Sequence, residues 1–379
     1  MGKYNLHATV AFGLEAITKR ELIGLGMENV RVEDGKVRFS GDEYDIAKAN
    51  LWLRTADRVL LEVGEFKALS FTELFDKTRE IPWEEYIPED GNFTVDGSSV
   101  KSKLFSISDS QSIVEKAIVE RLKENYKGVD WFEKTGARYK VKVALLRDIA
   151  TITIDTTGES LHKRGYRKRQ AIAPIKETLA AAMVMLSFWK PERPLFDPFC
   201  GSGTILVEAA LIGKNIAPGL DRSFVAETWD MIDPKVWKEE RVKALKEIRN
   251  DVKLNLLGSD IDRKLVLIAR DNAFNLGLED DIAFTIKDFR DVDLKDDYGV
   301  LITNPPYGER ISEIDEAKEL YKDLGEKMKD LKTWSIYVIT NHEDFEKSYG
   351  RKADRKRKLF NGNIKTDYYQ FYGERPPRE

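Results

Sequence analysis

The sequence predicts an α/β protein in which two small α+β domains precede a larger, doubly wound domain with a parallel sheet. In the second half of the chain, short apolar runs alternate with segments of helical periodicity, which is typical of parallel strands covered by helices on both faces. The first half also alternates strand-like and helix-like runs, and Asp34-Gly35 between two of them is a tight-hairpin signal. A chain of 379 residues is long enough for two or three such domains.

The composition indicates a cytoplasmic protein without a metal centre. The single cysteine, Cys200, excludes a disulfide framework, and the three histidines lie far apart in the sequence, which argues against a metal site. We expect no secretory signal and no membrane span, because the longest apolar stretch, at 179–189, is too short. The 34% of charged residues and the scarcity of glutamine are typical of a hyperthermophile's protein. A net charge of −4 does not exclude nucleic acid, because local basic clusters decide that interaction.

Residues 1–62 are expected to form a ferredoxin-like α+β domain, and residues 63–160 a second α+β domain. In the first, strands are predicted at 5–10, 29–33 and 36–39 and helices at 14–25 and 45–51. In the second, strands are predicted at 59–66, 92–95, 139–145 and 150–155 and helices at 71–78 and 110–126. Ser110 is the expected N-cap of the last helix, and the polar loop before it carries Lys101 and Lys103.

A basic segment, residues 161–173, is predicted to link the second domain to the third. It places five cations around one aromatic ring: Lys163, Arg164, Tyr166, Arg167, Lys168 and Arg169. Charge runs are usually solvated surface, so a plain interdomain linker is one interpretation. The other is an RNA contact in which the cations bind phosphates and Tyr166 stacks on a base.

Residues 174–379 are expected to form the doubly wound domain. Its predicted strands lie at 195–197, 254–260, 282–286, 300–303 and 334–340, and its helices at 173–189, 205–212, 263–276 and 314–328. Pro174 would stand in the first turn of the first helix. A terminal antiparallel hairpin is predicted at 355–372, with its turn at Asn361-Gly362. Residues 213–253, which contain Trp229 and Trp237, form an insertion to which the sequence assigns no role.

The loop after the first predicted strand of this domain has the composition of a ligand-binding turn. Its two glycines allow the backbone to turn tightly and to approach a ligand closely. Leu206 replaces the third glycine of a dinucleotide loop, and no Gly-Lys-Ser/Thr phosphate loop is present, so a nucleoside without a pyrophosphate fits best. Asp197 would hold a cationic ammonium group, and Cys200 can be a simple gap filler. The candidate residues are Asp197, Phe199, Cys200, Gly201, Ser202, Gly203 and Thr204.

Carboxylates also end the next two predicted strands. Asp260, followed by Ile261, is placed to accept hydrogen bonds from both hydroxyls of a ribose. Asp288 and Phe289 could accept from an adenine amine and stack on its face, with an ordinary polar loop as the alternative. Asp262 is expected to cap the helix that follows.

The stretch Asn304-Pro305-Pro306-Tyr307 follows the buried strand predicted at 300–303. Two successive prolines fix φ and remove two N–H donors, so the Pro305 carbonyl and the Asn304 amide oxygen form a pair of acceptors beside an aromatic ring. Such a site suits a planar base with an exocyclic NH2 group. A rigid turn in which Tyr307 only packs is the alternative.

In their order at the strand ends, these motifs resemble those of Rossmann-fold S-adenosylmethionine-dependent methyltransferases that act on amino groups. Residues 63–160 resemble a THUMP domain, and 161–167 resemble the signature that follows it. Nearly the whole chain is therefore similar to the THUMP-containing guanine N2-methyltransferases. Asn304, where the tRNA guanosine-10 enzymes tend to have aspartate, and the extra N-terminal domain favour the archaeal tRNA guanosine-6 branch, with bacterial ribosomal RNA enzymes nearby.

The resemblance implies S-adenosylmethionine as cofactor and N2-methylguanosine in a tRNA acceptor stem as product, with the THUMP domain on the tRNA 3′ end. The flipped guanine would stack on Tyr307 and offer both N2 hydrogens to Asn304 and the Pro305 carbonyl. Asn304, Pro305, Pro306 and Tyr307 are the catalytic candidates, and Asn304 also borders the cofactor. RNA would be bound by Lys101, Lys103 and the basic linker, and no obligate protein partner is expected. The alternatives are a ribosomal RNA guanine enzyme, an N6-adenine enzyme and a non-catalytic RNA-binding assembly factor.

Overall fold

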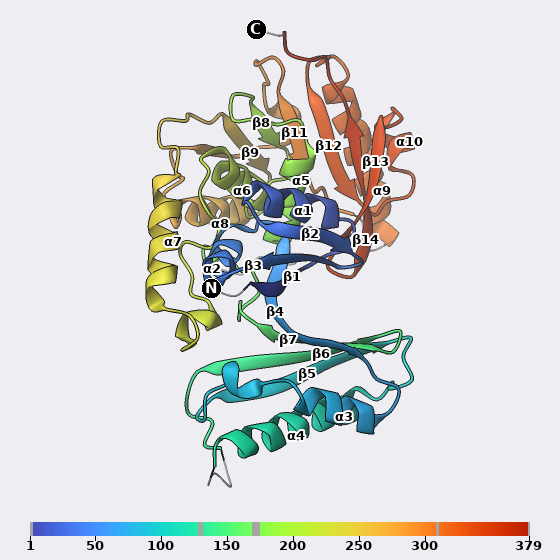
Figure 1. Cartoon of the computed structure of the whole chain (residues 1–379). Coiled ribbons are helices and arrows are strands. Elements are labelled where there is room, and N and C mark those ends of the chain that lie inside the picture. Colours follow the sequence, from blue (N-terminus) through green and yellow to red (C-terminus); the bar gives the residue numbers. More distant parts are fainter. Residues whose placement is uncertain (1–2, 128–131, 169–174, 308–310, 378–379) are drawn as a thin grey trace. The chain divides into compact units, whose positions relative to one another are not determined.

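The computed structural model describes residues 3–127, 132–168, 175–307 and 311–377, which form two compact units, each built on a seven-stranded sheet (Figure 1). Unit 1 comprises residues 1–10, 19–161 and 222–243, and unit 2 comprises residues 11–18, 162–221 and 244–379. Among the helices of the described ranges, none is long and apolar enough to cross a membrane.

The sheet of unit 1 runs continuously through both predicted small domains, in the order β2-β3-β1-β4-β7-β6-β5. Its strands are β1 (Tyr4–Val10), β2 (Glu28–Glu33), β3 (Lys36–Gly41), β4 (Ala56–Lys67), β5 (Asn92–Val100), β6 (Arg138–Leu146) and β7 (Ile149–Asp155). The long strand β4 pairs with β1 on one side and with β7 on the other. The boundary expected between residues 62 and 63 therefore falls inside a strand that both halves of the sheet share.

The helices of the N-terminal half are α1 (Glu15–Gly24), α2 (Glu43–Trp52), α3 (Phe71–Arg79) and α4 (Ile107–Asn125). Helices α3 and α4 cover one face of β5 to β7 (Figure 1). The prediction of Ser110 as N-cap was wrong: α4 is capped by Ser106, whose hydroxyl accepts from the Asp109 N–H, and Ser110 is buried one turn inside the helix. Strand β5 also continues to Val100, because it pairs with β6 along its whole length.

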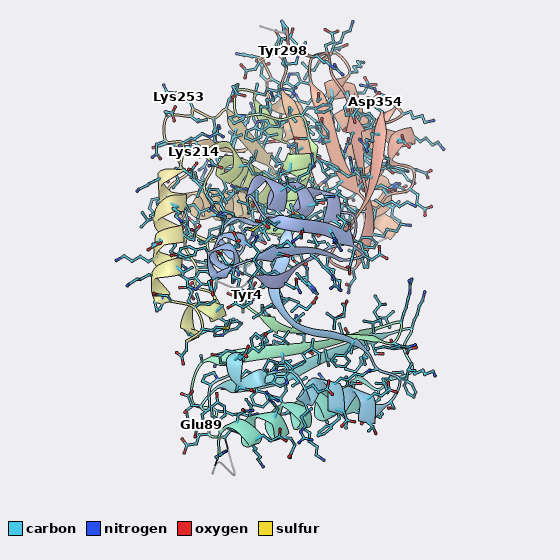
Figure 2. All side chains as sticks on the ribbon, viewed as in Figure 1. Tyr4, Glu89, Lys214, Lys253, Tyr298 and Asp354 are labelled. Atoms are coloured by element: carbon cyan, nitrogen blue, oxygen red, sulfur yellow. The ribbon has the colours of Figure 1, made fainter. Side chains whose placement is uncertain are left out.

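Part of the insertion whose ends lie near Lys214 and Lys253, labelled in Figure 2, completes the core of unit 1. Trp229 is 1% exposed, stacks on Tyr139 of β6 with ring centroids 5.0 Å apart, and donates from Nε1 to the Arg138 carbonyl at 3.0 Å. Trp237, at the start of α7 (Pro234–Lys246), stacks on Phe224 at 5.3 Å. The two tryptophans are structural, which the sequence did not indicate.

Unit 2 confirms the doubly wound domain and its terminal hairpin. The strand order is β10-β9-β8-β11-β12-β14-β13. The strands are β8 (Leu195–Asp197), β9 (Leu256–Asp260), β10 (Ile282–Ile286), β11 (Val300–Thr303), β12 (Ser335–Thr340), β13 (Arg355–Asn361) and β14 (Ile364–Phe371). Strands β8 to β12 pair in parallel, whereas β14 pairs antiparallel with both β12 and β13.

Helices cover both faces of this sheet, and the four residues of β11 are therefore all buried, with side chains that alternate between two cores. Val300 and Ile302 belong to a core with α5 (Glu177–Leu186), α6 (Thr204–Gly213) and α8 (Arg263–Phe274). Leu301 belongs to the opposite core, with α9 (Ile311–Met328) and α10 (Phe345–Tyr349). Because β8 has β9 on one side and β11 on the other, the strand order reverses at β8, and a ligand site is expected at the carboxyl ends of these strands.

Candidate active site

A cavity of about 560 Å³ lies in unit 2 at the carboxyl ends of β8 to β11, where the strand order reverses. Its lining contains predicted residues from all four motifs: Phe199, Gly201, Asp260, Ile261, Asp288, Phe289, Asn304, Pro305, Pro306 and Tyr307. The fold thus brings together segments that are up to about a hundred residues apart in the sequence. The lining also includes residues that sequence reasoning did not single out: Pro198, Leu265, Arg290, Leu320, Asn361 and Ile364.

The loop between β8 and α6 needs both of its glycines, for different reasons. Gly203 has φ +79°, and a Cβ there would stand 2.7 Å from the Phe284 ring. Gly201 has φ +51°, but nothing lies within 4 Å of the place that its Cβ would take. The Gly201 N–H donates to Asp260 Oδ2 at 3.0 Å, which fixes the loop against the end of β9. Gly201 therefore leaves its backbone open on the cavity side, and its contact with a ligand stays a prediction.

Asp260 is held rigidly at the cavity by two backbone donors. In addition to Gly201 on Oδ2, the Asp262 N–H donates to Oδ1 at 2.9 Å. Each carboxylate oxygen keeps a further lone pair, so both remain able to accept from a vicinal pair of hydroxyls. Ile261 is 74% exposed and lines the cavity beside this carboxylate, where its apolar surface is available to a flat ring. Asp262 caps α8 through the Lys264 N–H at 2.7 Å, as predicted.

Asp288 and Phe289 both reach the cavity, but each is already engaged. Asp288 accepts from the Arg290 N–H at 2.9 Å and from its guanidinium at 2.7 Å, and Arg290 also pairs with Asp323 at 2.6 Å. Phe289 is 2% exposed and packs against Phe199 with centroids 5.0 Å apart. The ring of Phe289 is thus mainly a core side chain, and stacking on a ligand stays a prediction.

Several predicted ligand residues of the loop lie behind the cavity instead of lining it: Asp197, Cys200, Ser202, Gly203 and Thr204. Asp197 is 1% exposed, and its Oδ1 accepts from the Thr303 hydroxyl at 2.7 Å and the Phe199 N–H at 3.2 Å. Burial raises the pKa of Asp197 to about 7, although these hydrogen bonds oppose the rise. Burial also raises the pKa of the Cys200 thiol, which fits a gap filler and not a nucleophile.

The raised pKa of Asp197 predicts a pH-dependent stability. The folded chain keeps a proton on Asp197 that the unfolded chain releases, so this group's stabilising contribution is lost as pH rises from about 4 through about 7. Asp197→Asn cannot titrate. The free energy of unfolding of Asp197→Asn minus that of the parent should therefore increase by about 2 to 4 kcal/mol as the pH rises from 5 to 8. Urea denaturation of both proteins at the two pH values measures this; a difference that does not change with pH would contradict it. Asp293→Asn, at an exposed carboxylate, is the matched control.

Hydrogen bonds from neighbouring side chains hold the loop after β11, which carries the Asn304 and Pro305 acceptors, in place. The Tyr307 hydroxyl donates to Asn304 Oδ1 at 2.6 Å and accepts from Asn361 Nδ2 at 3.5 Å. Burial raises the pKa of Tyr307 to about 12, so its hydroxyl stays protonated as a donor. The Tyr321 hydroxyl donates to the Pro306 carbonyl at 2.8 Å and supports the same loop. One lone pair of Asn304 Oδ1 is used by Tyr307, and the other is available to a ligand.

Asn361 was predicted only as a turn residue of the terminal hairpin. The structure places it at the end of β13, where it lines the cavity and contacts Tyr307, and Ile364 lines the cavity from the start of β14. The signal in the sequence was the Asn-Gly turn itself, but nothing in it showed which part of the fold the turn would reach.

The basic linker is largely internal, which corrects part of the RNA-binding prediction. Arg164 is 2% exposed and pairs with the fully buried Glu208, Nε to Oε1, at 3.3 Å. Tyr166 is also 2% exposed and belongs to the core with α5 and α6. Buried side chains cannot contact RNA in this fold, so the prediction was wrong for these two residues.

The other linker residues divide into three groups. Arg167 points inward: its guanidinium donates to the Thr204 hydroxyl and to the Ile175 carbonyl, and pairs with Glu177 at 3.2 Å. Lys163 and Lys168 are exposed, as are Lys101 and Lys103 in unit 1, so RNA contact stays a prediction for these four. Arg169 lies outside the described residues.

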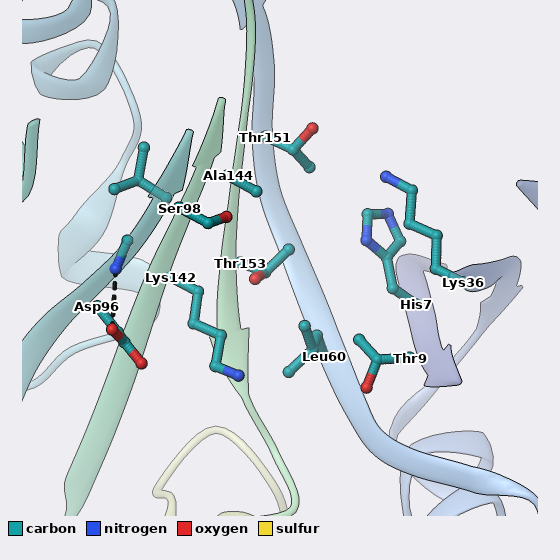
Figure 3. Close-up of a pocket in the computed structure, with 12 residues that line it drawn as sticks. His7, Thr9, Lys36, Leu60, Asp96, Ser98, Lys142, Ala144, Thr151 and Thr153 are labelled. Carbon is teal, nitrogen blue, oxygen red and sulfur yellow. Dashed lines mark hydrogen bonds between the residues drawn. The ribbon is translucent and has the colours of Figure 1, made fainter. Parts of the chain in front are cut away.

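A second cavity, of about 280 Å³, lies on the unit 1 sheet, against the face of β6 that carries Lys142 and Ala144 (Figure 3). The side chains of His7, Thr9, Ser98, Lys142 and Thr153 surround it. The sequence analysis did not predict this cavity.

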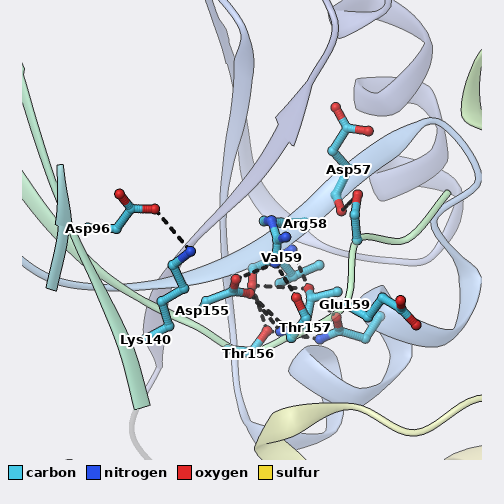
Figure 4. Close-up of polar contacts among 12 residues, drawn as sticks. Asp57, Arg58, Val59, Asp96, Lys140, Asp155, Thr156, Thr157 and Glu159 are labelled. Atoms are coloured by element: carbon cyan, nitrogen blue, oxygen red, sulfur yellow. Dashed lines mark hydrogen bonds and ion pairs between the residues drawn. The ribbon is translucent and has the colours of Figure 1, made fainter. Parts of the chain in front are cut away.

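Figure 4 shows polar contacts of the unit 1 sheet, including two ion pairs. Lys140 pairs with Asp96 at 3.0 Å, and Arg58 pairs with Asp155. The Lys142 ammonium has no ion pair with any residue that the structure describes, and burial lowers its pKa. The lining contains two lysines, of which Lys36 pairs with Glu33 at 3.2 Å, together with the Asp96 carboxylate and several hydroxyls. The described ranges contain no cluster of three or more His, Cys, Asp or Glu side chains able to hold a metal.

Three family models match the chain: an RlmL ferredoxin-like domain at residues 5–60, a THUMP domain at 68–155 and an RMKL-like methyltransferase domain at 164–370. YpsC of Bacillus subtilis, whose assigned name is that of an RNA methyltransferase, is 52% identical over 100% of this chain and 99% of its own length. The ribosomal RNA large subunit methyltransferase K/L of Psychromonas ingrahamii is 34% identical over 97% of this chain, and this chain spans 50% of that relative.

Solved structures resemble the chain over nearly its whole length. A protein of Listeria monocytogenes described as a predicted N6-adenine-specific DNA methylase has a TM-score of 0.95 at 51% identity, with 99% of this chain and 97% of that chain covered. The methyltransferase SMU.472, solved with SAH, has a TM-score of 0.94 at 45% identity, with both chains covered completely.

Proposed function

The chain belongs to the RNA methyltransferase family with RMKL-like methyltransferase and THUMP domains, and from this premise we propose the reaction that it catalyses. The reaction is direct transfer of a methyl group from S-adenosylmethionine to the exocyclic N2 amine of a guanine in RNA. The observation that carries the proposal is the Asn304-Pro305 acceptor pair, which lines the same cavity as the predicted cofactor residues.

The residues of the cavity fit S-adenosylmethionine. Gly201 leaves open space for a ligand against the backbone, the two oxygens of Asp260 suit the ribose hydroxyls, and Ile261 offers an apolar surface to the adenine. The related SMU.472 was solved with SAH, which is the demethylated form of this cofactor. When bound, the cofactor supplies an electrophilic methyl group on its sulfonium. The protein's task is then to aim an amine lone pair at that methyl group.

Asn304 and Pro305 are positioned for this task. The Asn304 amide oxygen and the Pro305 carbonyl would each accept one N2 hydrogen of a flipped guanine, which turns the nitrogen lone pair out of conjugation with the ring. The hydrogen bond from Tyr307 fixes the amide oxygen before the substrate binds, and the Tyr307 ring is available for stacking. No strong base is needed before transfer, because the nitrogen loses its proton only after the new C–N bond has formed.

We propose large-subunit ribosomal RNA as the substrate. Two relatives named ribosomal RNA large subunit methyltransferase K/L are 34% and 33% identical to this chain over 97% and 96% of its length. Since the chain spans only about half of these relatives, their whole activity does not carry over to it. The second candidate is guanosine 6 of a tRNA acceptor stem, which is favoured by asparagine instead of aspartate at position 304.

Methyl transfer into unmodified RNA tests both candidates. The purified chain would be incubated with labelled S-adenosylmethionine and transcribed large-subunit ribosomal RNA, tRNA or single-stranded DNA, and the products hydrolysed to nucleosides and mapped. We expect N2-methylguanosine in ribosomal RNA. N2-methylguanosine confined to the tRNA acceptor stem would select the second candidate. N6-methyladenosine in any substrate would refute the guanine assignment, and cofactor binding without transfer to any of them would favour an assembly factor.

A further inference from the structure

The most exposed large apolar side chain of the described residues is Phe105, with 83% of its surface accessible. It is the last residue before the Ser106 cap of α4. A single exposed ring is common on protein surfaces, but one that lies near other exposed apolar side chains and cations indicates an interaction site. The next most exposed large apolar side chain is Ile261, at 74%. It lines the proposed cofactor cavity, so the proposed cofactor would cover it. Phe105 lines neither of the two cavities described above.

The exposure of Phe105 does not come from a loose loop, because the backbone around it is fixed. The Lys103 N–H donates to Asp148 Oδ1 at 2.7 Å, and the Asp148 N–H donates to the Ser102 hydroxyl at 3.0 Å. The Ser99 hydroxyl donates to the Leu104 carbonyl at 2.7 Å, and the Leu104 side chain is buried. The ring is therefore held outward by its neighbours on both sides.

The two turns that form this end of the sheet carry cations. Lys101, Lys103 and Arg147 are all exposed, and Lys101 and Arg147 have φ of +50° and +52°. Asp148, the acidic residue of the second turn, accepts from the Lys103 backbone, as described above. An apolar edge lies beside the cations: Val100 pairs with Leu146, and Leu146 with Ile149, and the three are 54%, 50% and 37% exposed.

An exposed aromatic ring among cations fits a ligand that has flat apolar faces and negative charges at regular spacing, which describes single-stranded nucleic acid. A protein partner would use the apolar surface but would not need three cations around it. We propose that Phe105 is a stacking platform for an unpaired base of the RNA substrate, and that Lys101, Lys103 and Arg147 bind the flanking phosphates. This inference rests on the proposed RNA methyltransferase function and names where unit 1 holds an unpaired nucleotide.

The test uses the full chain and a fluorescently labelled RNA hairpin with a single-stranded 3′ extension, compared with the same hairpin without the extension. Phe105→Ala should weaken binding of the extended RNA roughly tenfold or more and leave binding of the blunt hairpin within twofold. Phe105→Trp should retain affinity within about threefold, because stacking is preserved. Phe274→Ala, at a ring that is 68% exposed in unit 2, is the matched control and should change neither affinity.

The salt dependence separates the two parts of the proposed site. Replacing Lys101, Lys103 and Arg147 together by alanine should flatten the dependence of affinity on salt concentration, whereas Phe105→Ala should leave that slope unchanged. The proposal would be overturned if Phe105→Ala weakened binding of both RNAs equally, or weakened binding of neither. It would also be overturned if the chain formed a dimer in solution that Phe105→Ala dissociates. If the Phe105 effect appears but no RNA is methylated, the proposed function fails and this inference stands. If RNA is methylated without any Phe105 effect, the reverse holds.

Discussion

Replacing Asn304 by alanine is expected to lower the rate of methyl transfer by roughly a thousandfold. The side chain supplies one of the two acceptors that would orient the attacking amine, and Tyr307 holds its oxygen in place at 2.6 Å. Without it, the amine keeps its lone pair in conjugation, and only the Pro305 carbonyl remains to hold it. Affinity for S-adenosylmethionine and for RNA should change by less than about threefold, because the other cavity residues are untouched. Single-turnover transfer from labelled cofactor, with separate binding titrations, measures the three quantities.

Two further variants make the Asn304 result specific. Asn304→Asp keeps an acceptor oxygen at this position and should retain much more activity than the alanine variant. Asn255→Ala removes an exposed amide whose Nδ2 donates to Asp296 at 3.0 Å, just before β9 and therefore at the opposite end of the sheet from the cavity. This control should behave like the parent. Activity of Asn304→Ala within a few-fold of the parent would show that the acceptor site is assigned to the wrong residues.

Replacing Trp229 by alanine is expected to destabilise unit 1 by about 3 to 5 kcal/mol. The indole is 1% exposed, stacks on Tyr139 at 5.0 Å with an interplanar angle of 20°, and donates to the Arg138 carbonyl at 3.0 Å. Alanine would leave a cavity against the sheet and an unpaired carbonyl on β6. Urea denaturation followed by far-UV circular dichroism measures the loss.

Trp229→Phe keeps this experiment informative if the alanine variant does not fold. Phenylalanine preserves the stacking but not the hydrogen bond, so the free energy of unfolding of Trp229→Phe should lie between those of the parent and of Trp229→Ala. Val242→Ala, at an α7 side chain that is 42% exposed, is the surface control and should change the unfolding free energy by less than about 0.5 kcal/mol. A loss below about 1 kcal/mol for Trp229→Ala would show that this segment of the insertion is not part of the core of unit 1.

The features predicted well from the sequence depend on neighbours that are close along the chain. The cap at Asp262, the hairpin turn at Asn361-Gly362 and the strands at 195–197, 282–286 and 300–303 follow from turn chemistry and apolar periodicity, and the structure confirms them. Even these local signals do not always distinguish between two candidate residues. Ser106 and Ser110 are equivalent caps by residue type, and Ser106 is the one that caps because the helix extends one turn further toward β5.

The features predicted wrongly depend on partners that are distant along the chain. Five cations around Tyr166 predict an exposed RNA contact from composition, but Arg164 meets Glu208, 44 residues away, and both are buried. Trp229 shows no periodicity that would assign it to a sheet 90 residues earlier. Asn361 likewise reaches the cavity only because the hairpin folds back beside Tyr307, 54 residues before it.

The sequence by itself determined the order of strands and helices, the fold class and the four motifs at the strand ends, because these depend on residue type, spacing and short-range backbone geometry. Only the tertiary structure decided which motif residues line the cavity and which, such as Asp197 and Cys200, support it from behind. It also decided which charges are paired in the interior and that Phe105 is left in solvent. The physical reason is that burial and ion pairing are set by contacts between segments far apart in the chain, and residue type alone does not specify those contacts.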